Sequence, residues 1–345
     1  MTAALTAPFV ADTLREYGGL VRDALVDYLP VREPRRYLYD LLADYPHRTG
    51  KMMRPSICIA SARAFGARPG EALRSAVAIE LLHNALLIHD DIEDGSEERR
   101  GRPTLHRLHG IPLAINAGDP LTLMSLRPLL ENATTIGPRV ALRILEQTER
   151  MARESAEGQA IELGWRRDNT VDVDDAAYLE MVLKKTCWLA TIYPSWVGAT
   201  IGARGGVALE PFIRFGFFLG AAFQIQDDLL NLVDDSGRYG KELDGDICEG
   251  KRTLMLIRLL EQADADERAR LIDILRLGRE ERTPEHVRWV RDRMDAYGCI
   301  EYARQVAHGL AGAALHEFTR LYGGLPDSRD KRFLEGLVTW VFERT

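Results

Sequence analysis

Apolar residues recur at the spacing of an α-helix along most of the 345-residue chain. In EALRSAVAIELLHNALLIHDD (71–91) and RLIDILRLGREE (270–281) they fall at positions i, i+3, i+4 and i+7, which gives each segment an apolar face. Convincing strand-like alternation is absent from the sequence, and turn signals rich in glycine and proline separate the helical segments. The sequence therefore predicts one all-α domain over residues 1–345, a single large helical bundle, with residues 1 to about 15 flexible.

The composition excludes some classes of partner. A formal net charge of −7 argues against a nucleic-acid-binding protein, although it is compatible with a local basic pocket for a small phosphorylated molecule. No stretch of 18 apolar residues runs without a charge, so we expect no transmembrane segment, and the first residues lack the pattern of a signal peptide. The cysteines have neither metal-ligand nor redox-motif spacing and favour a reducing, cytoplasmic location; they are Cys58, Cys187, Cys248 and Cys299.

An acidic cluster, HDDIED (89–94), follows the strongly apolar segment ELLHNALLI. On a helix, Asp90 and Asp94 lie on one face and Asp91 is turned by only about 100°, so the three carboxylates can converge. They would repel one another without a compensating charge, and oxygen ligands of this kind suit Mg²⁺. Taken alone, the cluster is also compatible with a solvated acidic helix end.

A second acidic cluster repeats the arrangement more than a hundred residues later. In FFLGAAFQIQDDLLN (217–231), an apolar helix again ends in paired acids, Asp227 and Asp228, followed by Asn231. Two apolar helices that end in the same way are hard to explain as solvated surface. If the helices are neighbours, their carboxylates face each other across the mouth of the bundle and could hold several Mg²⁺ ions around a diphosphate.

Basic residues accompany both acidic clusters. Arginine and lysine would bind phosphate directly, while the acids would bind it through metal ions. Each basic residue alone is more simply explained as a surface charge, but the glycine–lysine pairs in YGKELDGDICEGKRT favour an ordered loop that closes over a ligand. The residues of interest are Lys51, Arg54, Arg99, Arg100, Lys184, Lys185, Lys241 and Lys251.

From about Gly50 to its end, the chain resembles the trans-isoprenyl diphosphate synthases, or polyprenyl synthetases, and most of all their geranylgeranyl diphosphate synthases. HDDIED is similar to the family's first aspartate-rich motif, DDxxD, and QIQDDLLN to the second, with Asn231 where many members have Asp. Thr49-Gly50-Lys51 stands where the family usually has GGK. The resemblance implies an isoprenoid synthase fold, an all-α bundle around a deep apolar cavity, and a homodimer.

The resemblance also implies the reaction. An allylic diphosphate (dimethylallyl, geranyl or farnesyl) would condense with isopentenyl diphosphate and release pyrophosphate. The cofactor would be Mg²⁺, with three ions expected beside a bound diphosphate. By motif match, the metal site would consist of Asp90, Asp91, Asp94 and Asp227, with support from Asp228 and Asn231.

Substrate contacts follow from the same motif match. Arg99, Lys185, Lys241 and Lys251 would bind the allylic diphosphate, and Gly50, Lys51, Arg54, His83 and Arg100 would form the isopentenyl diphosphate pocket. Thr186 and Gln224 would stabilise the carbocation, so that Lys185, Thr186, Gln224 and Lys241 form the predicted catalytic set. For His83, the simpler alternative is a buried core histidine whose ring nitrogens are hydrogen-bonded within the protein.

The length of the product depends on how much room the helix before Asp90 leaves. In the family, bulky aromatic residues four and five positions before the first motif stop growth at C15. Leu86 and Ala85 stand here, which favours the C20 product, geranylgeranyl diphosphate, and Leu82 could lie one turn deeper. C15, C25 and longer products stay open, and for any one of these residues ordinary core packing is the simpler explanation.

Two other functions are compatible with parts of the pattern. A class I terpene cyclase would ionise similar substrates but would need no isopentenyl diphosphate pocket, so Lys51, Arg54, His83 and Arg100 argue against it. A non-catalytic subunit of a heteromeric synthase would commonly lose acidic motifs, and both are intact here.

Overall fold

The structure, a computed structural model, describes residues 3–48, 50–233 and 243–343. Its first half contains α1 (Ala3–Leu25), η1 (Val26–Tyr28), η2 (Arg35–Tyr39), α2 (Asp40–His47), α3 (Met53–Ala64), α4 (Leu73–Asp94), α5 (Leu105–His109), α6 (Ile111–Met124), α7 (Leu126–Thr135) and α8 (Pro138–Arg167). Its second half contains α9 (Asp175–Val182), η3 (Leu183–Ile192), α10 (Tyr193–Gly202), α11 (Glu210–Val233), α12 (Gly245–Glu249), α13 (Leu254–Gln262), α14 (Ala265–Arg276), η4 (Arg279–Glu281), α15 (Pro284–Ala296), α16 (Cys299–Tyr322) and α17 (Arg329–Glu343).

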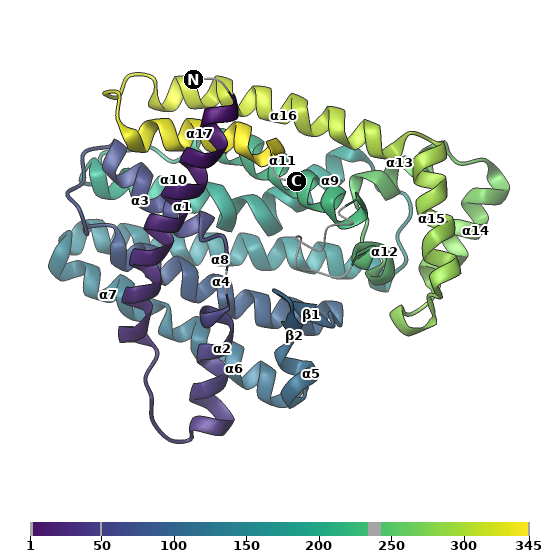
Figure 1. Ribbon diagram of the computed structural model, residues 1–345, viewed down its shortest axis with the longest axis horizontal. Coiled ribbons are helices and arrows are strands. Elements are labelled where there is room, and N and C mark those ends of the chain that lie inside the picture. The colour runs from purple at the N-terminus through teal and green to yellow at the C-terminus, as the bar shows by residue number, and fades with distance from the viewer. Residues whose placement is uncertain (1–2, 49, 234–242, 344–345) are drawn as a thin grey trace.

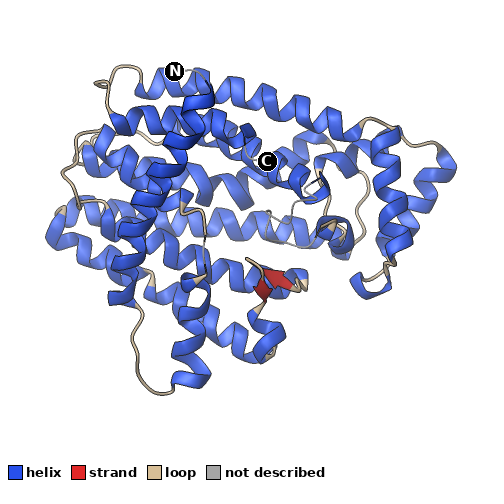
Figure 2. Ribbon diagram, viewed as in Figure 1, coloured by secondary structure: helices blue, strands red, loops and turns tan. Residues whose placement is uncertain are grey.

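The predicted all-α fold is confirmed. Within the described residues, the only strands are β1 (Glu98–Arg99) and β2 (Arg102–Pro103), a small antiparallel hairpin that stands out among the helices in Figure 2. The sequence analysis did not predict this hairpin. Its two-residue loop has Arg100 and Gly101 at φ 55° and 69°, the left-handed conformation that a tight hairpin turn requires.

The long helices α4, α8 and α11 pass through the middle of the bundle, and the π-helical segment η3 packs between α8 and α11 (Figure 1). α4 ends at Gly95, whose φ of 65° provides a left-handed C-cap. α8 begins with Pro138, which suits the first turn because a helix leaves that backbone N–H without a partner. These elements bring the ends of α4 and α11 to the same region of the molecule.

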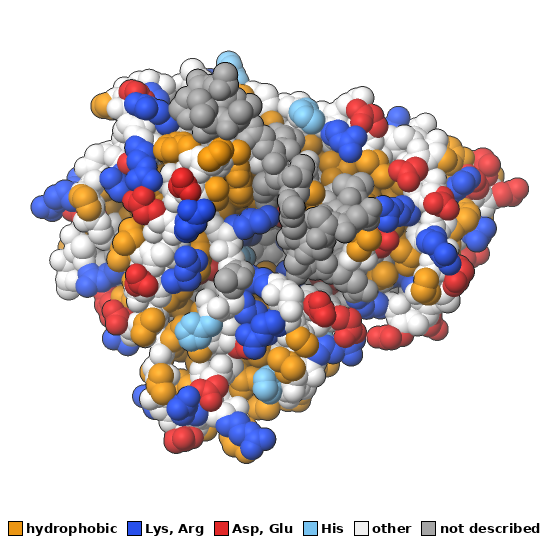
Figure 3. Space-filling view, viewed as in Figure 1, with side chains coloured by type: hydrophobic (Ala, Val, Ile, Leu, Met, Phe, Trp, Pro, Cys, Tyr) orange, Lys and Arg blue, Asp and Glu red, His pale blue; other side chains and the backbone are white. Residues whose placement is uncertain are grey.

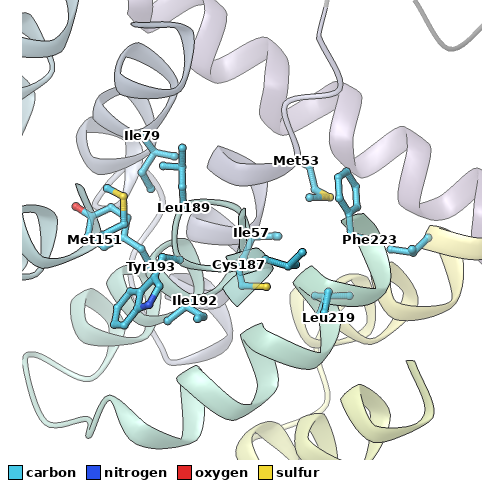
Figure 4. Packing of buried hydrophobic residues seen from close by; sticks show 14 of the residues in the cluster. Met53, Ile57, Ile79, Met151, Cys187, Leu189, Ile192, Tyr193, Leu219 and Phe223 are labelled. Carbon is cyan, nitrogen blue, oxygen red and sulfur yellow. The ribbon is translucent and has the colours of Figure 1, made fainter. Parts of the chain in front are cut away.

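The core runs through the whole bundle. Figure 4 shows part of it, where Met53 and Ile57 of α3 pack near Cys187 of η3 and Phe223 of α11. The prediction of one domain over residues 1–345 stays a prediction, which this shared core supports. The expectation that residues 1 to about 15 are flexible also stays a prediction; in the structure α1 begins at Ala3 and Val10 is buried.

The two terminal helices pack side by side, and α1 also contacts α3 and α4 (Figure 1). The Tyr17 hydroxyl of α1 donates a buried hydrogen bond to Asp330 of α17, so this hydrogen bond joins the two terminal helices in addition to their apolar contacts.

None of the helices in the described parts of the chain has the length and apolar character needed to span a bilayer. Positive and negative side chains are interspersed over the face drawn in Figure 3.

The close approach of α3 and α10 generates a prediction. A Cβ atom on Gly198 would lie 2.2 Å from the carbonyl oxygen of Cys58, so Gly198→Ala must push two backbones apart. We expect it to lower the free energy of unfolding by about 1–3 kcal/mol or more, as overpacking does. The matched control is Gly309→Ala on α16, where a Cβ meets nothing within 4 Å, and a gain of up to about 1 kcal/mol is expected. Denaturant unfolding of both variants checks this, and equal effects would contradict it.

Candidate active site

A cavity of about 1040 Å³ opens between α3, α4, α8, η3 and α11, with the hairpin at its mouth. Its polar end carries acidic and basic side chains from both predicted clusters. Its inner wall is apolar and includes Met53, Leu86, Leu163, Met181, Leu189 and Phe223. Figure 4 shows Met53, Leu189 and Phe223 on their three elements. A charged mouth above an apolar wall suits an amphiphilic ligand with an anionic head.

The acidic clusters meet at this cavity. Asp90 at the end of α4 and Asp227 at the end of α11 both line it, although 137 residues separate them in the sequence. Asp90 Oδ1 lies 3.4 Å from Lys185 Nζ, and Asp90 Oδ2 lies 3.4 Å from Arg99 Nη2. The structure therefore brings together the acids and the bases that the sequence analysis selected.

Asp91 and Asp94, two of the predicted metal ligands, hold protein cations instead of lining the cavity. Asp91 is fully buried, accepts a hydrogen bond from Tyr45 and pairs with Arg99, whose Nε lies 2.9 Å from Oδ1. Burial raises the pKa of Asp91, and Arg99 opposes this shift. Asp94 pairs with Arg166 and with Lys251, whose Nζ lies 2.8 Å from Oδ2. Both carboxylates are therefore engaged by protein donors, and their metal-binding role stays a prediction.

Asp228 and Asn231 extend the second cluster into the protein. Asp228 accepts hydrogen bonds from Tyr178 Oη (2.9 Å) and Gln224 Nε2 (2.7 Å), and burial followed by Asp246 raises its pKa to about 8. Asn231 is 1 % exposed, and its Oδ1 accepts a hydrogen bond from the backbone N–H of Asp246 at 3.0 Å. This oxygen fixes the start of α12, and the predicted support of a metal ion by Asn231 stays a prediction.

The predicted catalytic residues Lys185, Thr186 and Gln224 lie together on η3 and α11. The Thr186 hydroxyl donates to Gln224 Oε1 at 2.8 Å, and Lys185 is paired with Glu162 of α8 as well as with Asp90. Burial alone would lower the pKa of Lys185, but Glu162 and Asp90 outweigh it and raise that pKa. Lys185 is therefore a cation at every physiological pH.

The crossing of α8 and η3 fixes where Lys185 lies. A Cβ atom on Gly158 of α8 would come within 2.1 Å of the backbone nitrogen of Lys185, so only glycine allows this contact.

Lys251 lines the cavity as well and also pairs with Glu249, at 2.7 Å. Lys241, the remaining predicted catalytic residue, and Thr49 lie outside the described residues.

A second basic corner lies on the other side of the mouth. It contains the residues predicted for isopentenyl diphosphate, which all line the cavity: Gly50, Lys51, Arg54, His83 and Arg100. Arg100 Nη1 donates to the carbonyl oxygens of Tyr45 and Arg48. A Cβ atom on Gly50 would lie 2.9 Å from the guanidinium carbon of Arg100, so a larger residue there would displace this guanidinium group.

The three residues predicted to set the chain length differ in where they lie, and their role stays a prediction. Leu86 lines the cavity, whereas Ala85 and Leu82 are buried and do not. The reason is helix geometry. Viewed down the helix axis, the side chain of Leu86 is turned by about 40° from that of Asp90, the side chain of Leu82 by about 80° and the side chain of Ala85 by about 140°. His83, turned by about 20°, lies on the cavity face.

Several residues of the site escaped the sequence analysis. Tyr45, Arg166 and Tyr178 partner the acids from elements far away in the chain, and no local pattern marks them. Glu80 and Glu162 are buried acids that face the basic residues. A usable signal existed for Glu80, because it stands one helical turn before His83 in an otherwise apolar segment.

Comparison with known proteins agrees with this geometry. The family model described as Polyprenyl synthetase matches residues 35–294. The short chain isoprenyl diphosphate synthase of Methanothermobacter thermautotrophicus is 36 % identical over 302 residues, which cover 86 % of this chain and 88 % of that protein. The geranylgeranyl pyrophosphate synthase of Geoglobus acetivorans is 31 % identical over 97 % of this chain and 99 % of that protein.

Solved structures are similar over nearly the whole chain. The geranylgeranyl pyrophosphate synthetase of Pyrococcus horikoshii superposes with a TM-score of 0.85 at 33 % identity, covering 97 % of this chain and 98 % of that one. A geranylgeranyl pyrophosphate synthase of Corynebacterium glutamicum, complexed with isoprenyl diphosphate and magnesium, has a TM-score of 0.84 at 25 % identity and covers 96 % and 99 % of the two chains. The chain therefore belongs to the polyprenyl synthetase family, and the predicted trans-prenyltransferase class is confirmed.

The different surroundings of Asp90 and Asp91 predict different effects of the same substitution. Asp91→Asn leaves Arg99 without its buried counter-charge, so we expect a loss of about 3–5 kcal/mol in the free energy of unfolding. Asp90→Asn changes a cavity-lining group and is expected to change stability by less than about 1 kcal/mol while removing activity. Unfolding curves and initial rates of both variants check this. A stable Asp91→Asn variant would show that the buried pair is dispensable.

Proposed function

We propose that the chain condenses isopentenyl diphosphate with an allylic diphosphate (dimethylallyl, geranyl or farnesyl) in a Mg²⁺-dependent reaction whose product is geranylgeranyl diphosphate. The observation that carries this proposal is the meeting of Asp90 and Asp227 with two basic corners above one apolar cavity. Such a cavity offers two anion sites and a shared apolar space, which a reaction between two prenyl diphosphates needs.

The carboxylates fit Mg²⁺. Asp90 and Asp227 line the cavity, and carboxylate oxygen is a preferred donor for this ion. Among the described residues, no group of three or more acids, histidines or cysteines forms a complete metal cage. This also fits, because Mg²⁺ in such sites typically keeps waters and takes further ligands from substrate phosphate. When bound, the ion supplies Lewis-acid stabilisation of the departing diphosphate.

The two basic corners support separate sites for the two substrates. Arg99, Lys185 and Lys251 lie beside the acids, which supports binding of the metal-bound allylic diphosphate at this corner. Lys51, Arg54 and Arg100 line the other corner, which the second diphosphate would occupy. Carboxylates hold Arg99, Lys185 and Lys251, and carbonyl oxygens hold Arg100, before substrate binds. Little reorganisation of these four side chains is therefore needed during the reaction.

The cavity wall between the corners would meet the developing allylic cation. The Thr186 hydroxyl donates its hydrogen bond to Gln224, so the lone pairs of the Thr186 oxygen are left to face positive charge. Phe223 adds the negative face of an aromatic ring, which attracts cations. Apolar side chains around these groups exclude water, which would otherwise trap the cation as an alcohol.

The direct test uses purified protein, Mg²⁺, farnesyl diphosphate and radiolabelled isopentenyl diphosphate. We expect label in a C20 diphosphate, identified by chromatography after dephosphorylation, and none when EDTA removes the metal. A hydrocarbon formed without isopentenyl diphosphate would instead support the terpene cyclase alternative. No consumption of either substrate would support the non-catalytic subunit.

The product length generates a sharper prediction, since only one of the two candidate positions lines the cavity. Leu86→Phe should place a ring in the path of the growing chain and shift the main product from C20 to C15. Ala85→Phe, the matched control, points about 140° away from Asp90 and should cost stability without setting the length. Product chromatography checks both. A shortened product from Ala85→Phe alone would reverse this assignment.

We also propose a homodimer, through α6 and α7. Large apolar side chains are exposed there: Ile111, Ile115, Leu123 and Leu130, with Leu123 68 % and Leu130 61 % exposed. Exposed apolar side chains gathered on consecutive helices commonly mark a protein–protein interface, and the family resemblance makes a second copy of the chain the expected occupant.

The dimer can be tested with two charge substitutions. Leu123→Lys with Leu130→Lys should convert a dimer to a monomer in light scattering, because burying two unpaired ammonium groups is unfavourable. Leu20→Lys on α1, which changes another exposed leucine, should leave the mass unchanged. A monomeric parent protein, or a dimer that survives the double substitution, would exclude this interface.

The cytoplasmic location of the protein stays a prediction.

A further inference from the structure

A buried acid, Glu80, lies among the cations of the isopentenyl diphosphate corner. It is on α4, only 2 % exposed, and it lines the cavity together with Arg54, His83 and Arg100. Arg54 comes from α3 and Arg100 from the hairpin, so cations from two other elements face it. An acid at this place weakens the attraction of the corner for an anionic substrate, which calls for an explanation.

Glu80 is held by two neighbours on its own helix. Its Oε1 accepts a hydrogen bond from Asn84 Nδ2 at 3.0 Å, and its Oε2 lies 3.6 Å from Nδ1 of His83. Burial alone would raise the pKa of Glu80, but His83, Arg100 and Asn84 outweigh it and hold that pKa below its ordinary value. Glu80 is therefore ionised at neutral pH.

The carboxylate of Glu80 selects one tautomer of His83. Among the described residues, Nδ1 of His83 is buried without a hydrogen-bond partner, and Glu80 Oε2 lies 3.6 Å from it, too far for a hydrogen bond but close enough for electrostatic attraction. A proton on Nδ1 is therefore favoured by the negative oxygen, whereas the other tautomer would turn a lone pair toward it. Nε2 is then the nitrogen left to face the cavity that His83 lines. In the neutral ring this nitrogen is only an acceptor, so it would repel a phosphate oxygen.

The charge of His83 depends on what occupies the corner. Without a ligand, burial and then Arg54 lower the pKa of His83 to about 4, with Arg100 acting in the same direction and Glu80 opposing them. The ring is therefore neutral at pH 7. A diphosphate brings negative charge against the same cations and against the ring itself, which favours the imidazolium.

We propose that isopentenyl diphosphate enters this corner together with one proton from solvent, which His83 accepts at Nε2, and that Glu80 is the positioning residue that holds Nδ1–H. The imidazolium then donates to Glu80 on one side and to the diphosphate on the other. The buried acid thus serves as the fixed counter-charge of a cation that exists only when substrate is bound. This inference depends on the proposed function, because it names the substrate of that site.

The first consequence is a pH-dependent affinity. Since the bound state holds a proton that the free state lacks, the KM for isopentenyl diphosphate should rise with pH, by up to about tenfold per pH unit, between the pKa values of free and bound His83. In Glu80→Gln, the amide can donate to Nδ1 and leave a proton on neutral Nε2. Its KM should therefore lose most of this slope, while the KM for the allylic substrate serves as an internal control.

Proton uptake can be measured directly. Isopentenyl diphosphate is titrated calorimetrically into protein holding Mg²⁺ and a non-ionising farnesyl thiodiphosphate, in buffers of different ionisation enthalpy. The diphosphate's own protonation change is common to all variants, so differences between them report on the protein. The parent should take up about one proton more than Glu80→Gln and about one more than His83→Gln.

The possible outcomes separate clearly. Equal proton uptake by the parent and both variants would overturn the inference while leaving the proposed function intact. Absence of isopentenyl diphosphate binding to the parent would instead remove the proposed function itself. Thermal unfolding shows whether each variant is folded; if Glu80→Gln is not, His83→Gln, which keeps the buried carboxylate, decides the test.

Discussion

Charge that is buried in an apolar bundle needs an opposite charge close by, and the pair of Arg99 and Asp91 is where this constraint is strongest. Asp91 is fully buried at the end of α4, and its carboxylate would be an uncompensated charge without Arg99. Arg48 donates to three carbonyl oxygens of the hairpin, so the segment that carries Arg99 is held in place. The mouth of the cavity is thus organised by an acid that does not itself line it.

The same constraint shapes the rest of the mouth. Lys185 is paired with Glu162, and Lys251 with Asp94 and Glu249. Carboxylates of the surrounding helices therefore hold these two cavity-lining cations in place. Preorganised charges of this kind stabilise developing charge more than mobile ones, because the cost of orienting them is met during folding. The pairing also limits repulsion among the cations while no substrate is bound.

The sequence predicted the fold class and the two acidic clusters because both depend on local patterns: helical periodicity, and a motif that occurs twice. It did not show which side of a helix faces the cavity, and Ala85 and Leu82 therefore could not be distinguished in advance from Leu86, which lines it. It could not show that Asn231 fixes the start of α12, since that hydrogen bond joins two elements. Tyr178 and Arg166 escaped because their partners lie 50 and 72 residues away in the chain.

Arg99 and Arg100 are neighbours in sequence, yet they serve opposite corners of the cavity. Arg99 turns to Asp91 and Asp90, while Arg100 turns to the carbonyl oxygens of Tyr45 and Arg48. The tight turn at Arg100 and Gly101 makes this division possible, because its left-handed backbone reverses the chain within two residues. The reverse turn therefore sets the spacing of the two guanidinium groups, and one inserted residue there would change their positions relative to each other.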